Sequence, residues 1–449
     1  MSHFTNMSPT NEVGKPLNSH GPVRCLYHSA IGVDIHAQLL VCCFQKHLPE
    51  TNQLLSEQAQ FGTSNSQIKQ FVDWVSSHKP EIILMESTGV YWMSPYEALE
   101  SAGFTSQQLA VVNARDIKAA YGRKSDKADA RRLTEFARMN SFKRSFVPSR
   151  DIRTARLIAR RLHHATQDCT RESNRMQKLL SCSGTRISSV FSSFKGKAAQ
   201  KIINSFLDDS YPEFIACVRS NCSRLRATFT DIVDAFRQLN TPTFKELLLE
   251  QRKSWRQAME RRDRLEALLR IQMKPYKKTV DQLCAIPGVK ELAALKILSE
   301  IGTDLSSFRS SEAFCSWIGI CCGNNESAGK AKKSGTPKGN NYLRAYLTEV
   351  GQAIALVKTY TTVLRKVFQA FKERRGHNRA VVAIAHKIAR IIYTMIKNSI
   401  AYVEISSPTL EKIRLKKLRA SINNAKEVGI SLQKLSVVKD STGEILSDT

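Results

Sequence analysis

The sequence has 449 residues, and its 68 Lys and Arg against 40 Asp and Glu give a formal net charge of +28. Such a surplus attracts polyanions, so nucleic acid is the first partner to consider and an anionic membrane surface is the second. A hydrophobic content of 42% excludes wholesale disorder. The most apolar late stretch, residues 380–396, is interrupted by His386, Lys387 and Arg390, which excludes a membrane span. The eleven cysteines include no CxxC pair, and we expect reduced thiols in a cytosolic protein.

The first part of the chain predicts an α/β domain over residues 26–150. Residues 1–25 before it are polar and lack periodicity, which predicts a flexible arm. Short apolar runs then alternate with segments of helical spacing. The runs predict strands at 30–36, 39–44, 81–85 and 108–112, and the spacing predicts helices at 66–77, at 96–102 and from 126 onward. This alternation is typical of an α/β layer fold.

The middle of the chain, residues 151–280, predicts a helical insert. Apolar residues with helical spacing lie among many arginines over 151–180, and the pattern returns over 225–278 with Pro242 as its main interruption. Between these stretches the Ser- and Gly-rich segment 181–197 breaks the pattern. We therefore expect an antiparallel helix pair or a coiled coil. Its arginines suit nucleic-acid backbones, and an ordinary solvated helix face is the alternative.

A second, mostly helical unit is predicted over residues 281–405. It opens with a Pro287-Gly288 turn between apolar segments, which is typical of a helix-hairpin-helix. Backbone N–H groups at such a turn can hold a DNA phosphate, although Pro-Gly also serves plain helix turns. A loop dense in Gly, Ser and Lys follows at 323–339, and then helices at 343–357 and 380–401; residues 406–449 predict a basic, polar tail.

Four acidic residues are candidates for a metal site. Asp34 lies on a predicted strand, Glu86 ends another, and Asp126 and Asp129 are three apart on one helix face. Carboxylates suit Mg²⁺, and two such ions can activate one phosphoester oxygen and stabilise the leaving one. The alternative is structural, with Asp126 as a helix N-cap, Asp129 at the positive helix end and Glu86 as an ordinary strand-end acid. Spacing alone leaves both open.

These acidic segments resemble the DEDD-motif insertion-sequence transposases, a family whose N-terminal domain is RuvC-like, that is, RNase H-like. The matching motifs are Ile31-Gly-Val-Asp-Ile-His36, Met85-Glu-Ser-Thr-Gly-Val-Tyr91 and Lys124-Ser-Asp-Lys-Ala-Asp-Ala130. Residues 281–402 resemble the family's C-terminal transposase domain. Its motifs here are Ile286-Pro-Gly-Val289, Trp317-Ile-Gly319, Glu326-Ser-Ala-Gly-Lys330 and Gly339-Asn-Asn-Tyr-Leu-Arg344. The family commonly has Ser-Gly-Gly where this chain has Ser327-Ala-Gly329.

The resemblance implies roles for individual residues. Asp34, Glu86, Asp126 and Asp129 would bind two Mg²⁺ ions. Ser327 would be a nucleophile that forms a 5′-phosphoserine link to DNA, with Ser334 as the alternative. Apart from the resemblance, cationic side chains surround the serine in the sequence and could hold the scissile phosphate, and a solvated, flexible loop is the alternative; these residues are Lys330, Lys332, Lys333, Lys338 and Arg344.

The resemblance also implies partners. A structured noncoding RNA, the bridge RNA, would guide the protein by pairing with donor and target DNA, and the protein would form dimers that join into tetramers in the bacterial cytosol. The leading hypothesis is therefore an RNA-guided DNA transposase or recombinase of an insertion sequence. Two others stay open: a RuvC-like, structure-selective DNA nuclease without a covalent serine step, and a non-catalytic nucleic-acid-binding protein.

Overall fold

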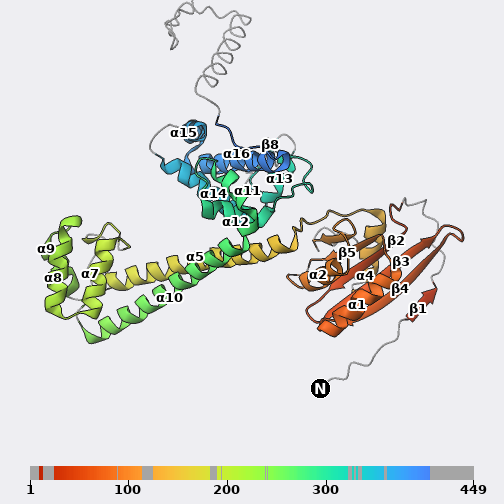
Figure 1. Cartoon of the computed structure of the whole chain (residues 1–449), viewed down its shortest axis with the longest axis horizontal. Helices are drawn as coiled ribbons and strands as arrows, with labels where there is room; N and C mark the ends of the chain where they lie inside the picture. Colours follow the sequence, from red (N-terminus) through yellow and green to blue (C-terminus); the bar gives the residue numbers. More distant parts are fainter. Residues whose placement is uncertain are drawn as a thin grey trace, which may run out of the picture. The chain divides into compact units, whose positions relative to one another are not determined.

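The chain folds into two compact units, Met1–Arg153 and Thr154–Thr449, which we describe separately (Figure 1). The computed structural model describes residues 10–13, 25–87, 89–113, 125–182, 190–193, 195–237, 239, 241–321, 326–327, 330–331, 336–357 and 362–404. Within these ranges, none of the helices combines the length and the apolarity that crossing a bilayer requires.

A six-stranded mixed sheet forms the centre of the N-terminal unit, with the strand order β1-β4-β3-β2-β5-β6. Its strands are β1 (Thr10–Val13), β2 (Ser29–Ile35), β3 (Leu39–Leu48), β4 (Gln53–Gly62), β5 (Ile82–Glu86) and β6 (Leu109–Val112). The pairs β1–β4, β4–β3 and β3–β2 are antiparallel, whereas β2–β5 and β5–β6 are parallel. Strands β2 to β6 form an RNase H-like sheet, which confirms the predicted fold class.

Helices cover both faces of this sheet. Helices α1 (Asn65–His78) and α2 (Met93–Ser101) lie on one face, and α4 (Asp126–Met139) lies on the other (Figure 1). Side chains alternate between the faces along each strand. Odd-numbered residues of β2 and β5, such as Ile31 and Ile83, pack towards α1 and α2, and even-numbered ones, such as Ala30 and Leu84, pack towards α4. Both faces are covered, which explains why β5 and β6 are nearly continuous apolar runs and why Asp34 in the middle of the sheet is an exception that needs an explanation.

The helical insert is a pair of long helices with a small lobe at its far end (Figure 1). Helix α5 (Arg150–Ser181) runs out to the lobe and α10 (Pro242–Gln272) runs back beside it, as predicted. Gln251 Nε2 of α10 donates to Glu172 Oε2 of α5 at 2.8 Å. The lobe consists of α7 (Lys197–Asp208), α8 (Tyr211–Asn221), η1 (Cys222–Arg224) and α9 (Phe229–Arg237), with its own aromatic core.

The rest of the C-terminal unit is mostly helical, as predicted. Its elements are η2 (Lys274–Tyr276), α11 (Lys277–Cys284), α12 (Glu291–Ile301), α13 (Ser311–Ile318), β7 (Glu326–Ser327), β8 (Lys330–Ala331), α14 (Asn341–Leu356), α15 (Val363–Arg375) and α16 (His377–Asn398). Helix α16 packs against α13, α14 and α15. Helices α11 and α12 pack against each other with the Pro-Gly turn between them, at the place of the predicted helix-hairpin-helix.

Three parts of the fold differ from the sequence expectations. Within the expected flexible arm, Thr10–Val13 form β1 and pair with β4, so the expectation of an arm without regular structure is wrong for these residues. Strand β4 itself was not predicted, because its side chains are mostly half-exposed and mixed in polarity. The helical pattern over 225–278 is interrupted at Pro242, as predicted, where α10 begins and the missing N–H of proline has no helical partner to lose; it differs in that α10 ends at Gln272 and is followed by η2 and the start of α11.

Candidate active site

Close backbone packing fixes α4 against the central strand of the sheet. Gly32 of β2 has no room for a side chain, because an added Cβ would lie 2.5 Å from both Ala130 O and Thr134 N of α4. The buried hydroxyl of Thr134 accepts the Gly32 N–H at 3.1 Å and lies 2.9 Å from Cys43 O of β3. The helix therefore has one well-defined position over β2 and β3.

The start of α4 carries two of the four predicted acids. Ser125 is the N-cap, and its hydroxyl accepts the Ala128 N–H at 3.3 Å. The alternative in which Asp126 caps the helix is therefore wrong, since the preceding serine does so. Asp126 and Asp129 lie in the first turn, where the helix dipole favours negative charge. The capping leaves the Asp126 carboxylate available for another role.

Asp34, His36 and Asp126 form a cluster at this helix start. One ligand atom from each lies within 4.8 Å of the others, and among the described residues this is the group with metal-binding geometry. His36 Nε2 lies 3.2 Å from Asp34 Oδ2 and 3.7 Å from Asp126 Oδ1. Asp34 is 5% exposed, whereas the side chain of Asp126 is 59% exposed. The cluster thus joins a buried carboxylate to one that faces solvent.

The electrostatics of the cluster fit a cation. Burial raises the pKa of the Asp34 carboxyl; the nearby His36 lowers it, and the negative charges of Asp126 and Asp129 raise it further. A divalent ion would offset both the burial of one carboxylate and the repulsion among the three. The two carboxylates are donors that Mg²⁺ or Mn²⁺ prefers, and the His36 imidazole, which is more typical of transition-metal sites, can support them by hydrogen bonding.

The other two predicted acids lie outside the group of three, and Asp129 is close enough for its charge to act on Asp34. The Asp129 carboxylate pairs with Arg132 Nη1 at 3.0 Å. Glu86 ends β5, the strand that pairs in parallel with β2, and it is half-buried. The alternation along β5 places Glu86 on the face that α4 covers, which is also the face of Asp34. All four acids therefore gather at one face and one end of the sheet.

His36 is the site residue that the sequence analysis missed. It lies two positions after Asp34, and residues two apart on a strand point to the same face. That spacing was the available signal. The spacing alone does not separate a functional histidine from one that packs beside the strand.

The predicted nucleophile lies on a short β-hairpin in the C-terminal unit. Strands β7 and β8 are antiparallel, and Ser327 is paired with Lys330. Lys332, Lys333 and the alternative nucleophile Ser334 lie outside the described residues. The pairing puts one predicted phosphate-binding residue, Lys330, directly across from the serine.

The segment that carries Ser327 is closed at its base by a backbone contact. The Asn340 N–H donates to Trp317 O at 3.1 Å. An added Cβ on Gly339 would lie 2.5 Å from Gly319 N, so the two ends of the segment touch without side chains between them. Gly319 also has a φ of +81°, which favours glycine. We call residues 319–339 the serine loop.

Two predicted phosphate-binding residues lie on the downstream side of the serine loop. Lys338 is exposed. Arg344 is half-buried, and its guanidinium donates to Asn341 Oδ1 at 2.7 Å and to Pro337 O at 3.4 Å. Arg344 thus ties the end of the loop to the start of α14, and its contact with DNA stays a prediction.

The Pro287-Gly288 turn also has a packing role. Gly288 has a φ of +85°, and an added Cβ would lie 2.7 Å from Ile354 Cγ1 of α14. The Val289 N–H donates to Ile286 O at 3.0 Å and is used within the turn. The geometry accounts for the glycine, and phosphate binding at Pro287 and Gly288 stays a prediction.

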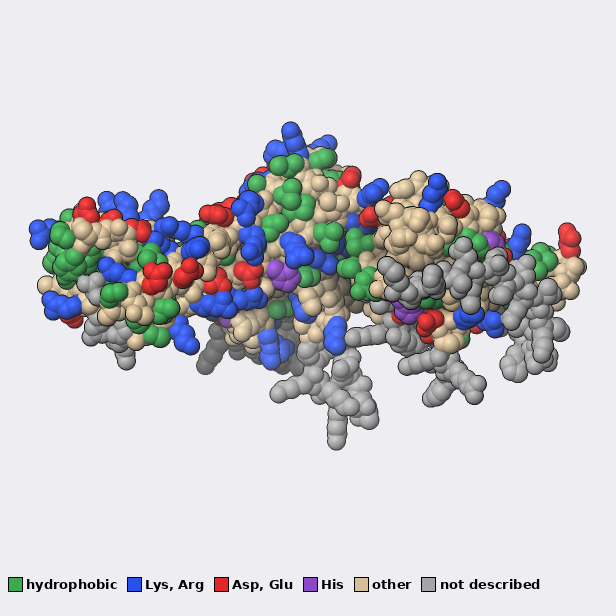
Figure 2. Space-filling model, turned by 90° about the horizontal axis from the view of Figure 1, so that it is seen from below, with side chains coloured by type: hydrophobic (Ala, Val, Ile, Leu, Met, Phe, Trp, Pro, Cys, Tyr) green, Lys and Arg blue, Asp and Glu red, His purple; other side chains and the backbone are tan. Residues whose placement is uncertain are grey.

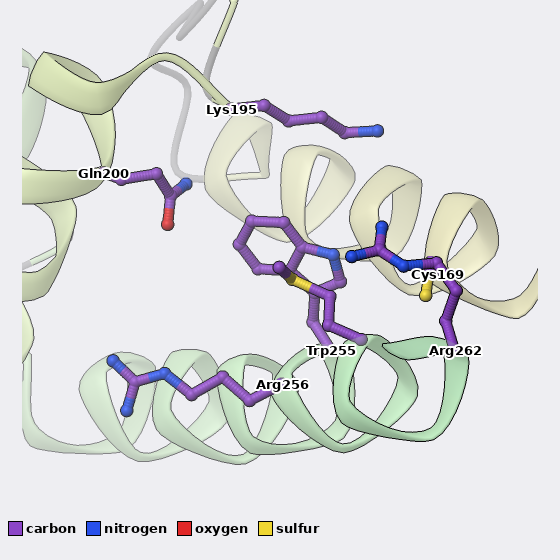
Figure 3. Close-up of a pocket in the computed structure, with 7 residues that line it drawn as sticks. Cys169, Lys195, Gln200, Trp255, Arg256 and Arg262 are labelled. Carbon is purple, nitrogen blue, oxygen red and sulfur yellow. The ribbon is translucent and has the colours of Figure 1, made fainter. Parts of the chain in front are cut away.

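The helical insert contains a cationic pocket that the sequence analysis did not identify. Figure 2 shows Lys and Arg side chains over much of the visible face, with acidic ones interleaved along the insert. A cavity of about 320 Å³ lies between α5, α10 and the chain before α7 (Figure 3). The residues that line it are Cys169, Lys195, Gln200, Trp255, Arg256, Met259 and Arg262.

Comparisons with known proteins connect the acidic cluster and the serine loop, each in its own unit, to one family. A DEDD-type transposase model of the IS110 group matches residues 31–183, and a model described as "Transposase IS116/IS110/IS902 family" matches residues 280–366. Together they cover just over half of the chain, in the order expected. The chain belongs to the IS110 family of transposases. The first match includes all four acids and His36, and the second includes the Pro287-Gly288 turn, α12 and the serine loop.

Two curated relatives of this IS110-family chain are similar over part of their length. The transposase for insertion sequence element IS1111A from Coxiella burnetii is 35% identical over 120 residues, which are 26% of this chain and 33% of the relative. A probable family 20 transposase from Pseudomonas aeruginosa is 26% identical over 125 residues, which are 27% of this chain and 37% of the relative. The chain thus spans about a third of the length of the curated relatives that it matches.

Proposed function

We propose that this chain is a DNA transposase of an insertion sequence. It cuts and rejoins DNA with a Mg²⁺-dependent acidic site and a serine nucleophile. The observation that carries the proposal is the cluster of Asp34, His36 and Asp126 at the start of α4, within a family match to transposases. The net charge of +28 supports a polyanionic substrate.

Asp34 and Asp126 would hold Mg²⁺, with Glu86 and Asp129 close by on the same sheet face. Bound there, the metal supplies charge stabilisation to a phosphoryl group and activates an oxygen nucleophile. The residues around the site hold these carboxylates in position. Thr134 and the absent side chain of Gly32 hold α4, and hence Asp126, at a fixed place beside the buried carboxylate of Asp34.

Ser327 would provide the nucleophile for strand cleavage. Its Oγ attacks the phosphorus, the Oγ–P bond forms and the bond from phosphorus to the 3′ oxygen breaks, which leaves a 5′-phosphoserine and a free 3′ hydroxyl. The serine proton ends on the released 3′ oxygen. Attack by the 3′ hydroxyl of another DNA end reverses these steps and rejoins the strands. Lys330 and Lys338 would neutralise charge on the phosphate in transit.

Replacing the nucleophile tests this proposal. Ser327→Ala is expected to abolish attachment of end-labelled DNA to the protein after phenol extraction, because alanine has no oxygen to bond phosphorus. Ser334→Ala is the matched control and should retain attachment. If wild type cuts DNA without any attachment, the protein is a metal-dependent nuclease without a covalent step. If neither cutting nor attachment occurs, the non-catalytic binding hypothesis replaces the proposal.

His36 is expected to support the metal site. His36→Ala should raise the Mg²⁺ concentration for half-maximal cleavage about 10- to 100-fold, which is the usual effect of removing a group that supports metal ligands. Calorimetric titration with Mn²⁺ should show the same weakening without any turnover. His28→Ala, an exposed histidine of the same unit, is the control. Equal Mn²⁺ affinity in wild type and His36→Ala would contradict this role.

The proposal extends to RNA guidance and to assembly. A structured noncoding RNA encoded beside the gene would pair with donor and target DNA, and the protein would act as dimers joined into tetramers. The basic insert supports contact with a polyanion (Figure 2). Purification from cells that carry the whole element should recover one discrete RNA species with the protein. Recovery of only random cellular RNA would remove the guide from the proposal and leave the chemistry in place.

A further inference from the structure

Behind the serine loop lies a buried ion network centred on Glu300. Glu300 is the penultimate residue of α12, and it is fully buried. Arg160 of α5 binds both of its carboxylate oxygens, with Nε to Oε1 at 2.7 Å and Nη2 to Oε2 at 2.9 Å. Arg156 lies one turn earlier on α5. Its Nε is 3.4 Å from Glu300 Oε2, and its Nη2 donates to the Glu300 backbone carbonyl at 2.6 Å. A buried carboxylate is tolerated when it is paired in this way.

A further donor to this carboxylate comes from the base of the serine loop. Asn340 Nδ2 donates to Glu300 Oε2 at 2.8 Å. The Asn340 Oδ1 atom caps α14 by accepting the Leu343 N–H at 3.1 Å. Its backbone N–H makes the bond to Trp317 O that closes the loop. One asparagine therefore joins the loop closure, the start of α14 and the buried carboxylate.

Neighbouring contacts hold both sides of this junction. The Arg160 guanidinium stacks on the Tyr342 ring at 4.6 Å, in the first turn of α14. The Tyr342 hydroxyl lies 2.9 Å from His164 Nε2 of α5. On the other side, the Trp317 ring packs against Phe308 and Phe314. Trp317, whose carbonyl accepts the Asn340 N–H, is therefore held in place by aromatic packing.

We propose that Glu300 is a positioning residue for the serine loop. Its carboxylate orients the Asn340 carboxamide and so maintains the backbone contact that holds Trp317–Gly319 against Gly339–Asn340. The two ends of the serine loop are thereby held in one geometry, which limits the positions that Ser327, between these ends in the chain, can take. The link to catalysis rests on the proposed function, whereas the link to loop closure does not.

The substitution Asn340→Ser separates positioning from folding. Serine is a good N-cap, so α14 keeps its capped start, but its hydroxyl is too short to reach Glu300. We expect Tm to stay close to that of wild type. Hydrogen exchange of peptides spanning residues 317–340 should become about tenfold faster, because the loop base opens locally more often. Covalent attachment to DNA should slow about 100-fold, with DNA affinity unchanged, as expected for a misplaced reacting group.

Two further variants complete the test. Glu300→Gln removes the charge and should cause the same loosening, if it folds. Asn378→Ser, an exposed asparagine in the first turn of α16, is the matched control and should behave as wild type. Unchanged exchange in Asn340→Ser would overturn the inference, and so would faster exchange with an unchanged rate of attachment. If wild type forms no DNA adduct, the proposed function fails, while faster exchange would still support Glu300 and Asn340 as the closure of the loop.

Discussion

Asp34→Asn is expected to abolish metal-dependent DNA cleavage and to raise Tm. The asparagine fits the same space but offers no negative charge to a cation. Several kcal/mol of transition-state stabilisation would be lost, and at about 1.4 kcal/mol per tenfold this slows cleavage about 10³-fold or more. Asp126→Asn should have a similar effect on cleavage, since its carboxylate belongs to the same cluster.

The gain in stability follows from the pKa of Asp34. Burial, together with the charges of Asp126 and Asp129, raises this pKa in the folded protein above the ordinary value of 3.8. The unfolded chain therefore binds fewer protons in the window between the two values, and the free energy of unfolding falls as the pH rises through it. Asparagine has no ionisable group, so Asp34→Asn does not lose stability in this way. Its Tm should exceed that of wild type by the full amount at neutral pH and should equal it below about pH 4.

Single-turnover cleavage and thermal unfolding, each measured at pH 7 and in acid, test this expectation. Asp73→Asn, an exposed aspartate on α1 at the opposite face of the sheet, is the matched control. Cleavage by Asp34→Asn within tenfold of wild type would show that this cluster is not the metal site. A lower Tm at pH 7 would show that the Asp34 carboxylate is a net stabiliser in the metal-free protein.

Gly32→Ala should both destabilise the N-terminal unit and impair catalysis. The added methyl group would lie 2.5 Å from backbone atoms of α4 and 2.7 Å from Leu133 Cβ, where no flexible side chain can move aside. Helix α4 has to move away from β2, at a cost of about 3 kcal/mol. Asp126 moves with the helix, and cleavage should fall about 100-fold although no chemical group of the site is lost.

Chemical denaturation and the same cleavage assay measure both effects. Gly62→Ala is the matched control in this sheet, because its added Cβ would meet nothing closer than the flexible side chain of Gln67, at 3.3 Å, and the nearest backbone atom, Gln38 O, lies at an ordinary contact distance of 3.9 Å. A Gly32→Ala protein as stable as Gly62→Ala would mean that α4 is not held as closely as its backbone contacts indicate.

Local sequence patterns predict most of the helices and strands of this protein. The apolar runs of β2 and β5 and the apolar spacing of α1 and α5 predict those elements because each pattern reflects burial of its own segment. Strand β4 and helices α7 and α8 were not predicted. Strand β4 is half-exposed, and its pairing with β3 depends on a partner that its own pattern does not specify.

The candidate site was less predictable from local patterns. Spacing alone left a metal site and a structural role open for the acids, and only the folded chain shows that Asp34 and Asp126 lie in one cluster. The role of Ser125 as the cap depends on where α4 begins, and the contribution of His36 depends on how β2 ends. Glu300 and Asn340 are 40 residues apart in the chain, and no local pattern indicates that they meet.

Strand β1 has a practical consequence for handling this protein. It covers the backbone of β4, which would otherwise be an outer strand with unpaired N–H and C=O groups. Trimming the polar N-terminus to aid purification would uncover that strand and invite chains to aggregate edge to edge. Poor solubility of a shortened protein would then reflect its exposed sheet, and would carry no information about its chemistry.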